Sequence, residues 1–257
     1  MQDNNLNQYI IGRNAVMEAL RAGRPIDCIL VARGDRMGSV GAVIAKAREM
    51  GITIKEVSPA KLDGICPQGN HQGIAASAAA AEYADLEDLF RNAEKKGEPP
   101  FFIIADEIED PHNLGAIIRT ADAAGAHGVI IPKRRATGLT LAVGKASAGA
   151  VEYVPVAKVP NLARCIDELK KRGVWVYGTD MDGETWCSCD MSGAIAIVVG
   201  SEGEGMNRLI KDKCDFIVSL PMKGSINSLN ASVAAGIVMY EAARQRNLIP
   251  AKQPKGM

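Results

Sequence analysis

Apolar and polar positions in the first 80 residues recur at helix-like and strand-like spacings in turn. The pattern predicts strands at 26–33, 52–58 and 72–80, and helices at 15–23, at 40–51 and from Pro59. Asn14 is a suitable N-cap for the first helix, and Gly51 is a suitable stop for the second. We therefore expect a small α/β domain over residues 1–81.

The composition changes between residues 82 and 98. Acidic residues outnumber basic ones there, and the segment ends in the sequence KKGEPP. Charged segments rich in proline and glycine are typical of solvated connections between domains. We expect residues 82–98 to be an acidic linker.

From residue 99 onward, near-continuous apolar runs alternate with helical patterns. Strands are expected at 101–108, 127–132, 151–159, 174–180, 194–200 and 216–222, and helices at 114–126, 139–150, 161–173, 206–214 and 227–247. This alternation predicts a mostly parallel sheet covered by helices on both faces, over residues 99–250, followed by a basic tail at 251–257. Ligands bind at the carboxyl ends of such strands, so the loops after Ile104, Val199 and Leu220 are the candidate site.

Composition and charge narrow the class of protein. Of the 257 residues, 47% are hydrophobic and 23% are charged, which excludes disorder as the main state. Thirty basic side chains balance thirty acidic ones, so any contact with nucleic acid must come from a local patch. No apolar stretch approaches the ~20 residues that span a bilayer, and no secretory signal opens the chain. We expect a cytoplasmic protein without a membrane segment.

The six cysteines do not form a metal-binding pattern. Cys187 and Cys189 are close in sequence, but no second pair lies at the spacing of zinc ligands. We expect reduced thiols and no metal.

The first candidate segment is DEIEDPHNLGAIIRT, residues 106–120. It follows a predicted strand, Pro111 makes the entry rigid, and Asn113 is a residue type that starts helices. Arg119 lies six residues after Asn113, about 120° away around a helix, so the two side chains need not share a face. His112 is a possible general base by type, but we assign it no catalytic role.

The second candidate segment is the glycine-rich turn in AIAIVVGSEGEGMNR, residues 194–208. Its glycines at 200, 203 and 205 do not fit the dinucleotide-binding pattern, and no phosphate-binding P-loop pattern occurs in the chain. Glu202 and Glu204 would repel a pyrophosphate. Carboxylates in such a turn suit a ribose, an ammonium or a sulfonium.

The third candidate segment is FIVSLPMKGSINSLNASVAAG, residues 216–236. A strand ends at Pro221, and a helix rich in small residues is expected to begin at Asn227 or Ser228. Ser228 and Asn230 place polar side chains at its start. The small residues that follow permit the close approach of a ligand, a neighbouring helix or a second subunit.

Two stretches of the chain carry basic residues without acidic ones. The first, between 128 and 151, contains Lys133, Arg134, Arg135 and Lys145. The second follows Glu241 and contains Arg244, Arg246, Lys252 and Lys255. In a chain of zero net charge, such stretches are candidate phosphate contacts.

Together the three segments resemble the three motifs of the SpoU (TrmH-like) family of RNA ribose 2′-O-methyltransferases, in the SPOUT superfamily. The matching sequences are DPHNLGAIIRTADAAGA, IVVGSEGEGMNRLI and SLPMKGSINSLNASVAAGIVMYEA, in the order and spacing of that family. The N-terminal sequences IGRNAVMEAL and HQGIAA resemble the small substrate-binding domain often fused to it. The combination is most similar to the members that methylate a guanosine of 23S ribosomal RNA.

The resemblance implies a fold that the hydrophobic pattern does not reveal. The C-terminal domain would be a SPOUT-type parallel sheet tied in a deep trefoil knot, which binds S-adenosylmethionine (SAM) without a metal. The small α/β domain would bind RNA, and the protein would be a homodimer.

The resemblance also implies the site residues. It places Arg119, Asn113, Glu202, Ser228 and Asn230 in catalysis. It places Thr179, Gly200, Leu220, Ser228, Leu229 and Asn230 at the cofactor. At RNA we expect Lys133, Arg134, Arg135 and Lys145, from the basic stretch without acids, together with Arg13 of the N-terminal domain. Arg119 would either accept the proton of the ribose 2′-hydroxyl or orient that hydroxyl and a phosphate.

Three other functions are compatible with parts of the pattern. Transfer RNA is the alternative substrate for the same chemistry. An RNA-binding ribosome-assembly factor without catalysis is a different class, which the intact set of polar motif residues disfavours. A nucleotide-dependent dehydrogenase would need a phosphate fingerprint that the chain lacks.

Overall fold

The computed structural model describes residues 9–34, 39–66, 71–203, 205–225 and 228–246. The chain divides into two compact units. One comprises Met1–Glu82 together with Gly138–Gly144, and the other comprises Tyr83–Thr137 and Lys145–Met257. Glu204, Asn227 and the predicted basic tail at 251–257, with Lys252 and Lys255, lie outside the described residues.

The first unit is a four-stranded mixed sheet with helices. Its elements are β1 (Tyr9–Ile11), α1 (Arg13–Arg21), β2 (Ile26–Ala32), α2 (Ser39–Glu49), β3 (Thr53–Val57), α3 (Pro59–Ile65) and β4 (Ile74–Ala78). The strand order is β1-β4-β2-β3; β4 is antiparallel to both neighbours, and β2 and β3 are parallel. β2 is buried along its whole length, as its unbroken apolar run predicts.

The start of α1 and the limits of this unit differ from the expectation. Gly12, with φ of 92°, precedes the helix, so Asn14 lies inside the first turn and is not the cap. Residues 138–144 also pack with this unit, where Leu139 accepts a hydrogen bond from the Ala80 amide at 2.6 Å. A Cβ on Gly138 would collide with the buried carboxylate of Asp27, so the glycine permits this close packing.

The second unit contains a six-stranded sheet, as the alternating pattern predicts. The strands are β5 (Phe101–Ala105), β6 (Gly128–Pro132), β7 (Val156–Val159), β8 (Trp175–Thr185), β9 (Ile195–Val199) and β10 (Phe216–Ser219). Their order is β10-β8-β9-β5-β6-β7, and every neighbouring pair is parallel. The carboxyl ends of β5, β8 and β9 therefore lie side by side at one edge of the sheet.

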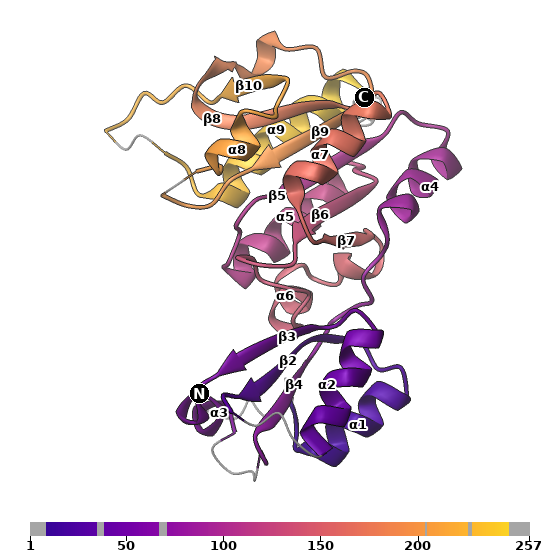
Figure 1. The fold of residues 1–257 in the computed structure, drawn as a ribbon. Coiled ribbons are helices and arrows are strands. Elements are labelled where there is room, and N and C mark those ends of the chain that lie inside the picture. Colours follow the sequence, from indigo (N-terminus) through magenta and orange to yellow (C-terminus); the bar gives the residue numbers. More distant parts are fainter. Residues whose placement is uncertain (1–8, 35–38, 67–70, 204, 226–227, 247–257) are drawn as a thin grey trace, which may run out of the picture. The chain divides into compact units, whose positions relative to one another are not determined.

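Helices cover both faces of this sheet (Figure 1). α7 (Leu162–Lys171), α8 (Arg208–Lys211) and α4 (Leu86–Lys96) form one apolar cluster with side chains of the central strands. On the other face, α9 (Ala231–Gln245) packs against β9 and against α5 (Pro111–Ala123). The central strands β5 and β9 are buried along their whole length, which explains their unbroken apolar sequences.

The segment expected to be a solvated linker contains a packed helix. α4 begins after Asp85, ends at Gly97 in the left-handed conformation, and buries Leu89 and Ala93. The excess of acidic residues belongs to the exposed face of this helix, and the apolar positions at helical spacing face the sheet.

Several other boundaries shift. The strand expected at 151–159 is preceded by a 3₁₀ turn at Ala150–Glu152 and begins only at Val156. The helix expected at 139–150 is limited to α6, Leu141–Ala146. The helix expected at 206–214 is the single turn of α8. The helix expected from Asn227 or Ser228 begins at Ala231. The trefoil knot that the resemblance implies stays a prediction.

Within the described residues, no helix is both long enough and apolar enough to cross a bilayer. All six cysteines are free thiols, and Cys187 is exposed while Cys189 is buried. No three potential metal-ligand side chains gather in the described part of the chain.

Candidate functional site

The start of α5 places the first polar residue of the site. Asp110 is the N-cap, and its carboxylate accepts a hydrogen bond from the His112 amide at 2.8 Å. Pro111 occupies the first helical position, where its missing N–H costs nothing. Asn113 was expected to start the helix, but Asp110 caps it and Asn113 lies buried in the first turn.

The loop after β9 is held in a tight turn. Ser201 and Gly205 exchange backbone hydrogen bonds of 3.0 and 3.1 Å, and Gly203 and Gly205 have φ values of 86° and 70°. A Cβ on Gly200 would lie 2.2 Å from the Gly205 carbonyl carbon, so only glycine fits there. These glycines shape a turn that displays the Glu202 side chain.

The start of α9 places the third polar group. Asn230 is the N-cap, and its Oδ1 accepts hydrogen bonds from the amides of Ser232 and Val233 at 3.0 and 3.3 Å. This capping leaves its side-chain amide nitrogen free to donate elsewhere. One residue thus fixes the helix start and contributes to the site.

The three segments meet in one hydrogen-bonded network. The Nδ2 of Asn113 donates to Oε1 of Glu202 at 3.0 Å, and the Nδ2 of Asn230 donates to Oδ1 of Asn113 at 2.9 Å. Asn230 also donates to the same Glu202 oxygen. The side chains of residues that are 28 to 117 positions apart in sequence are thereby held together. The structure thus brings three of the five predicted catalytic residues into contact.

A cavity of about 350 Å³ opens between the middle of β8, the carboxyl ends of β9 and β10, and the start of α9. Five of the predicted cofactor residues line it, namely Thr179, Gly200, Leu220, Ser228 and Leu229. Asn230 lies beside this lining without being part of it. Among the described residues of the lining, the charged ones are two carboxylates, Asp180 and Glu202.

The cavity wall includes residues that the sequence did not single out. Asp180 and Met181 follow Thr179, whose hydroxyl donates to the Val198 carbonyl at 3.0 Å. The small side chains of Ala231 and Ala234 leave room for the cavity along α9. Small residues at these positions are a signal for close approach, but the sequence does not say what approaches.

A second cavity, of about 420 Å³, adjoins the first and shares Ser201 and Glu202 with it. Its other lining residues come from the loop after β5 and the start of α5, namely Glu107, Ile108, Glu109, Asp110 and Asn113. Glu107 has a φ of 55°, and its carboxylate pairs with Arg135 at 3.2 Å. This cavity is rich in hydrogen-bond acceptors.

A buried carboxylate connects two loops of the site. Oδ2 of Asp106, at the end of β5, accepts a hydrogen bond from the Asn207 amide at 2.8 Å, and Asn207 caps α8. Burial raises the pKa of Asp106, and the hydrogen bond from Asn207 partly opposes this rise. Asp106 thus stabilises the base of the glycine turn, a role that its position in the sequence does not reveal.

Arg119 is not part of the network. Its side chain is exposed on α5, whereas Asn113 is buried, in agreement with their angular separation on the helix. It forms no hydrogen bond or ion pair with another described residue and lines neither cavity. Ser228 is also outside the network, although it lines the first cavity.

The predicted RNA-binding residues fall into two groups. Lys133, Arg134 and Arg135 follow β6, and Lys145 lies in the last turn of α6. Arg134, Arg135 and Lys145 are exposed, and Lys133 is partly exposed. Arg13 lies in the other unit and forms hydrogen bonds within it. Its Nε donates to the Gln72 carbonyl at 2.8 Å, and its Nη1 donates to Ser39 at 3.2 Å.

Comparison with known proteins identifies the family. The model of the SpoU rRNA methylase family matches residues 100–240, and a model described as RNA 2′-O ribose methyltransferase substrate binding matches residues 9–84. A Bacillus subtilis protein, YacO, whose name assigns it to the TrmH family of tRNA/rRNA methyltransferases, is 54% identical over 94% of this chain and 97% of its own. A Staphylococcus aureus protein with a name of the same kind is 48% identical over 93% and 96%.

Solved structures give the same result. The SpoU methyltransferase AviRb of Streptomyces viridochromogenes, in complex with AdoMet, matches with a TM-score of 0.59 and 26% identity, over 93% of this chain and 90% of its own. An AdoMet-bound rRNA methyltransferase of Sinorhizobium meliloti matches with a TM-score of 0.56 and 27% identity, over 92% and 87%. A TrmH/SpoU tRNA-modifying enzyme of A. aeolicus matches with a TM-score of 0.54 and 30% identity, over 63% and 84%.

The matched regions contain the three C-terminal motifs, the two N-terminal sequences that resemble the substrate-binding domain, and the site described above. The family model covers β5 to α9, which carry the hydrogen-bonded network and both cavities. The chain therefore belongs to the SpoU rRNA methylase family, and its N-terminal part is the substrate-binding domain of RNA ribose 2′-O-methyltransferases.

Proposed function

We propose that this protein transfers a methyl group from SAM to a ribose 2′-hydroxyl of RNA, at a guanosine of 23S ribosomal RNA. The observation that carries the proposal is the network of Asn113, Glu202 and Asn230 at the junction of the two cavities. It joins a cavity of cofactor size to a second cavity in which an acceptor nucleoside can lie. Membership of the SpoU family supports the same reaction.

The first cavity fits SAM in volume and in charge. A cavity of about 350 Å³ is within the range of small-molecule sites. The two charged residues in the described part of its lining are both carboxylates, which favour a sulfonium and disfavour a phosphate. Gly200, Gly203 and Gly205 of the turn line the cavity, and a side chain on residue 200 would overlap the backbone of Gly205. When bound there, SAM supplies a methyl group already activated on a cationic sulfur, so the reaction needs no metal.

The side chains of the network fix the geometry of the reaction. Glu202 is held by two amide donors, so its charge has one defined position beside both cavities. Asn113 and Asn230 hold the loops in register, which keeps the methyl donor and the acceptor oxygen in line. Alignment of this kind contributes on the order of 7–11 kcal/mol in well-ordered systems.

Arg119 is assigned to the RNA. It is exposed and forms no hydrogen bond or ion pair with another described residue, so its guanidinium is available to a phosphate and to the ribose 2′-hydroxyl. Arginine keeps its proton in proteins, and its fork of donors fits a phosphate. Arg119 thus orients the hydroxyl and a phosphate, and the hydroxyl proton leaves through that phosphate.

The second cavity supports guanosine as the target. Guanine presents N1–H and N2–H donors on one edge, whereas its other edge has only acceptors. The carboxylates of Glu107, Glu109 and Asp110 accept hydrogen bonds from such donors. A phosphate would be repelled by the same groups, so the base is the part of the nucleotide that this cavity suits.

The remaining assignments follow from charge and exposure. Lys133, Arg134 and Arg135 follow the carboxyl end of β6 and Lys145 lies on α6; all four are at least partly exposed, and Arg135 also pairs with Glu107. The N-terminal unit, including Arg13, would contact RNA beyond the target nucleotide. A homodimer is supported by an apolar stripe on α9: Val233, Ile237 and Tyr240 are 50%, 38% and 46% exposed at helical spacing.

The test uses purified protein, tritiated SAM and unmodified 23S rRNA transcript, with transfer RNA in a parallel reaction. We expect one alkali-resistant linkage in the 23S transcript, at a guanosine, and none with Arg119→Ala. Label in transfer RNA alone would replace the ribosomal substrate with the tRNA alternative. Failure of the protein to bind SAM would overturn the methyltransferase proposal.

A further inference from the structure

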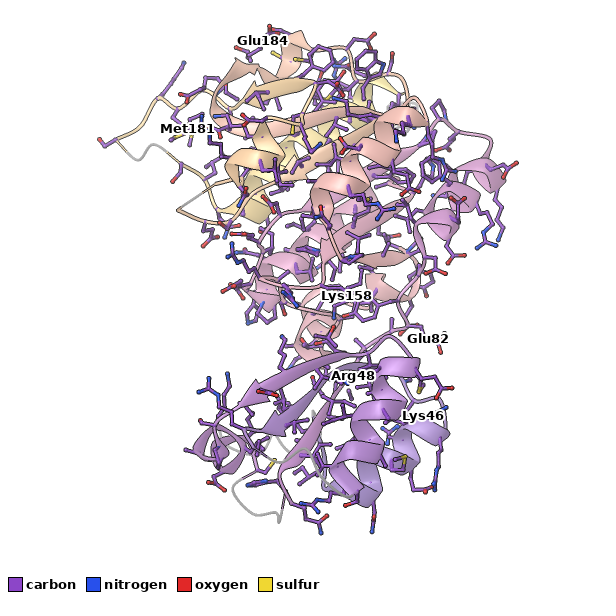
Figure 2. The ribbon with its side chains drawn as sticks, viewed as in Figure 1. Lys46, Arg48, Glu82, Lys158, Met181 and Glu184 are labelled. Atoms are coloured by element: carbon purple, nitrogen blue, oxygen red, sulfur yellow. The ribbon has the colours of Figure 1, made fainter. Side chains whose placement is uncertain are left out.

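β8 contains a break in its pairing at the cofactor cavity. Ile217 of β10 pairs with Gly178, but the next residue, Val218, pairs with Glu184. Residues 179–183 therefore have no partner in β10 and form an excursion from the ladder, in which Met181 and the flanking Glu184 are labelled in Figure 2. A Cβ on Gly183 would lie 2.5 Å from the Ile217 backbone, so this glycine permits the excursion to rejoin the sheet.

The excursion places Asp180 on the cavity wall in a fixed orientation. Its Oδ2 accepts a hydrogen bond from Nζ of Lys211 in α8 at 2.9 Å, and its Oδ1 accepts one from the Met181 amide at 2.7 Å. The side chain is 20% exposed. Burial alone would raise the pKa of Asp180, but the hydrogen bonds from Lys211 and from the backbone outweigh burial and lower it, so the carboxylate is ionised.

The two carboxylates of the cavity have different partners. Glu202 is bonded by neutral amides of Asn113 and Asn230, and no cation among the described residues forms an ion pair with it. Asp180 forms an ion pair with Lys211, so a cation in the cavity is attracted to Asp180 and repelled by Lys211. The ion pair does not use all the lone pairs of the Asp180 carboxylate, and these remain acceptors for neutral donors.

Because only Asp180 is paired with a cation, Glu202 and Asp180 suit different parts of SAM. The sulfonium is a charge without a hydrogen-bond donor, and it suits the uncompensated carboxylate of Glu202. The ribose of SAM is a neutral pair of hydroxyl donors, and it suits a carboxylate whose charge is compensated but whose lone pairs are accessible. Two carboxylates in one cavity thus match two chemically different parts of one ligand.

We propose that Asp180, oriented by Lys211, accepts hydrogen bonds from the ribose hydroxyls of the cofactor, an assignment that rests on the use of SAM in the proposed function. Asp180 is then a binding residue that discriminates by hydroxyl groups and not by charge. Lys211 is a positioning residue, because it does not line the cavity.

The test is calorimetric binding in the absence of RNA, with SAM, S-adenosylhomocysteine and an S-adenosylhomocysteine analogue that lacks both ribose hydroxyls. Asp180→Ala removes the acceptor, and we expect it to weaken SAM and S-adenosylhomocysteine equally, by about ten- to 100-fold. The dideoxy analogue should bind the variant and the original protein with equal affinity. Asp180→Asn, which keeps the shape, and a thermal melt of each variant exclude loss of the fold as the cause.

Two outcomes would overturn the inference. Weakened SAM with unchanged S-adenosylhomocysteine would mean that Asp180 responds to the sulfonium charge. Unchanged binding of both would mean that Asp180 does not contact the cofactor. If the original protein bound neither ligand, the proposed function would fail instead, so the two failures are distinguishable.

A second variant tests Lys211. Lys211→Met leaves the Asp180 carboxylate without its cation, so we expect the ratio of affinities for SAM and S-adenosylhomocysteine to shift toward the cationic SAM. A merely structural role would weaken both ligands without changing the ratio. Asp182→Asn is the matched control, because Asp182 also lies near Lys211, at 3.8 Å, but is 88% exposed and does not line the cavity. It should leave both affinities unchanged.

Discussion

The cofactor side and the RNA side of the proposed site are built differently. On the cofactor side, Asn113, Glu202 and Asn230 are bonded to one another, and Asp180 is bonded to Lys211. On the RNA side, Arg119 and Arg134 are exposed and form no hydrogen bond or ion pair with other described residues.

The difference follows from the size and charge of the two ligands. A small cofactor is bound best by groups that are already in position, because little side-chain entropy is then lost on binding. A polyanion is attracted by exposed cations, which exchange small counterions for phosphates. A cation already paired with a carboxylate would have to give up that partner first. The site is thus preorganised for one ligand and open for the other.

Gly200→Val should have the largest effect, because it disrupts the glycine turn of the cofactor side directly. The added carbons would overlap the backbone of Gly205 and Met206, where even a Cβ would lie at 2.2–2.5 Å. We expect a loss of about 3 kcal/mol in the free energy of unfolding, measured in urea, and no detectable SAM binding by calorimetry. Gly193→Ala is the control, since no atom lies within 4 Å of its Cβ position. Normal SAM binding by Gly200→Val would show that the turn is not part of the cofactor site.

Arg119→Ala should separate the two sides. Because Arg119 does not line the cofactor cavity, SAM affinity and thermal stability should be unchanged. Single-turnover methyl transfer should fall by at least about 100-fold, the usual cost of losing one transition-state donor. Arg119→Lys retains the charge but not the fork, so we expect an intermediate rate. Near-normal transfer by both variants would remove Arg119 from the chemistry.

A pH dependence of stability should come from the amino-terminal ends of β5 and β6, where His127 lies. His127 is fully buried, accepts a hydrogen bond from the Phe101 amide at 3.0 Å, and lies 3.1 Å from Glu98. Burial lowers its pKa to about 4. The unfolded chain therefore binds the proton first, and the stabilisation that is present above pH 6.5 is lost as the pH falls toward 4.

We expect this loss to reach roughly 3 kcal/mol, measured as the urea unfolding free energy between pH 7.5 and 4. His127→Gln should flatten the pH dependence, whereas His112→Gln, at an exposed position, should leave it as it is. If His127→Gln retained the full pH dependence, the titrating group would lie elsewhere.

Arg134→Ala should have the smallest effect, which we expect on RNA binding alone. One phosphate contact contributes about 0.7–0.9 to the slope of log affinity against log salt concentration, and we expect the slope for RNA to fall by that amount. SAM affinity should be unchanged. Lys171→Ala, at an exposed position at the end of α7, is the matched control and should not change the slope. An unchanged slope for Arg134→Ala would exclude a phosphate contact there.

Much of the second unit could be predicted from the sequence. The apolar runs of β5, β6 and β9 are buried strands, and parallel strands place the three motif loops at one edge. The angular separation of Asn113 and Arg119 along the helix is consistent with their different environments. α4 was not predicted, because the charge of its exposed face masks the apolar positions Leu89 and Ala93.

The roles of single polar residues were less predictable. Asp180 lies within β8 and Asp106 follows β5, and no local sequence pattern distinguishes either from a surface aspartate. Their partners, Lys211 and Asn207, are 31 and 101 residues away and meet them only because α8 packs beside β8 and β5. Arg13, which is expected at RNA, also forms hydrogen bonds with Gln72 and Ser39 of its own unit, and its contact with RNA stays a prediction.

The sequence by itself determined most of the strands and helices, the three motif loops and the family resemblance. These depend on local periodicity and on the order of short motifs, which are written along the chain. Tertiary structure alone decided which carboxylate has a cation beside it and which has only amides. That distinction depends on distances between residues far apart in sequence, and the interaction of two charges falls off with distance in space.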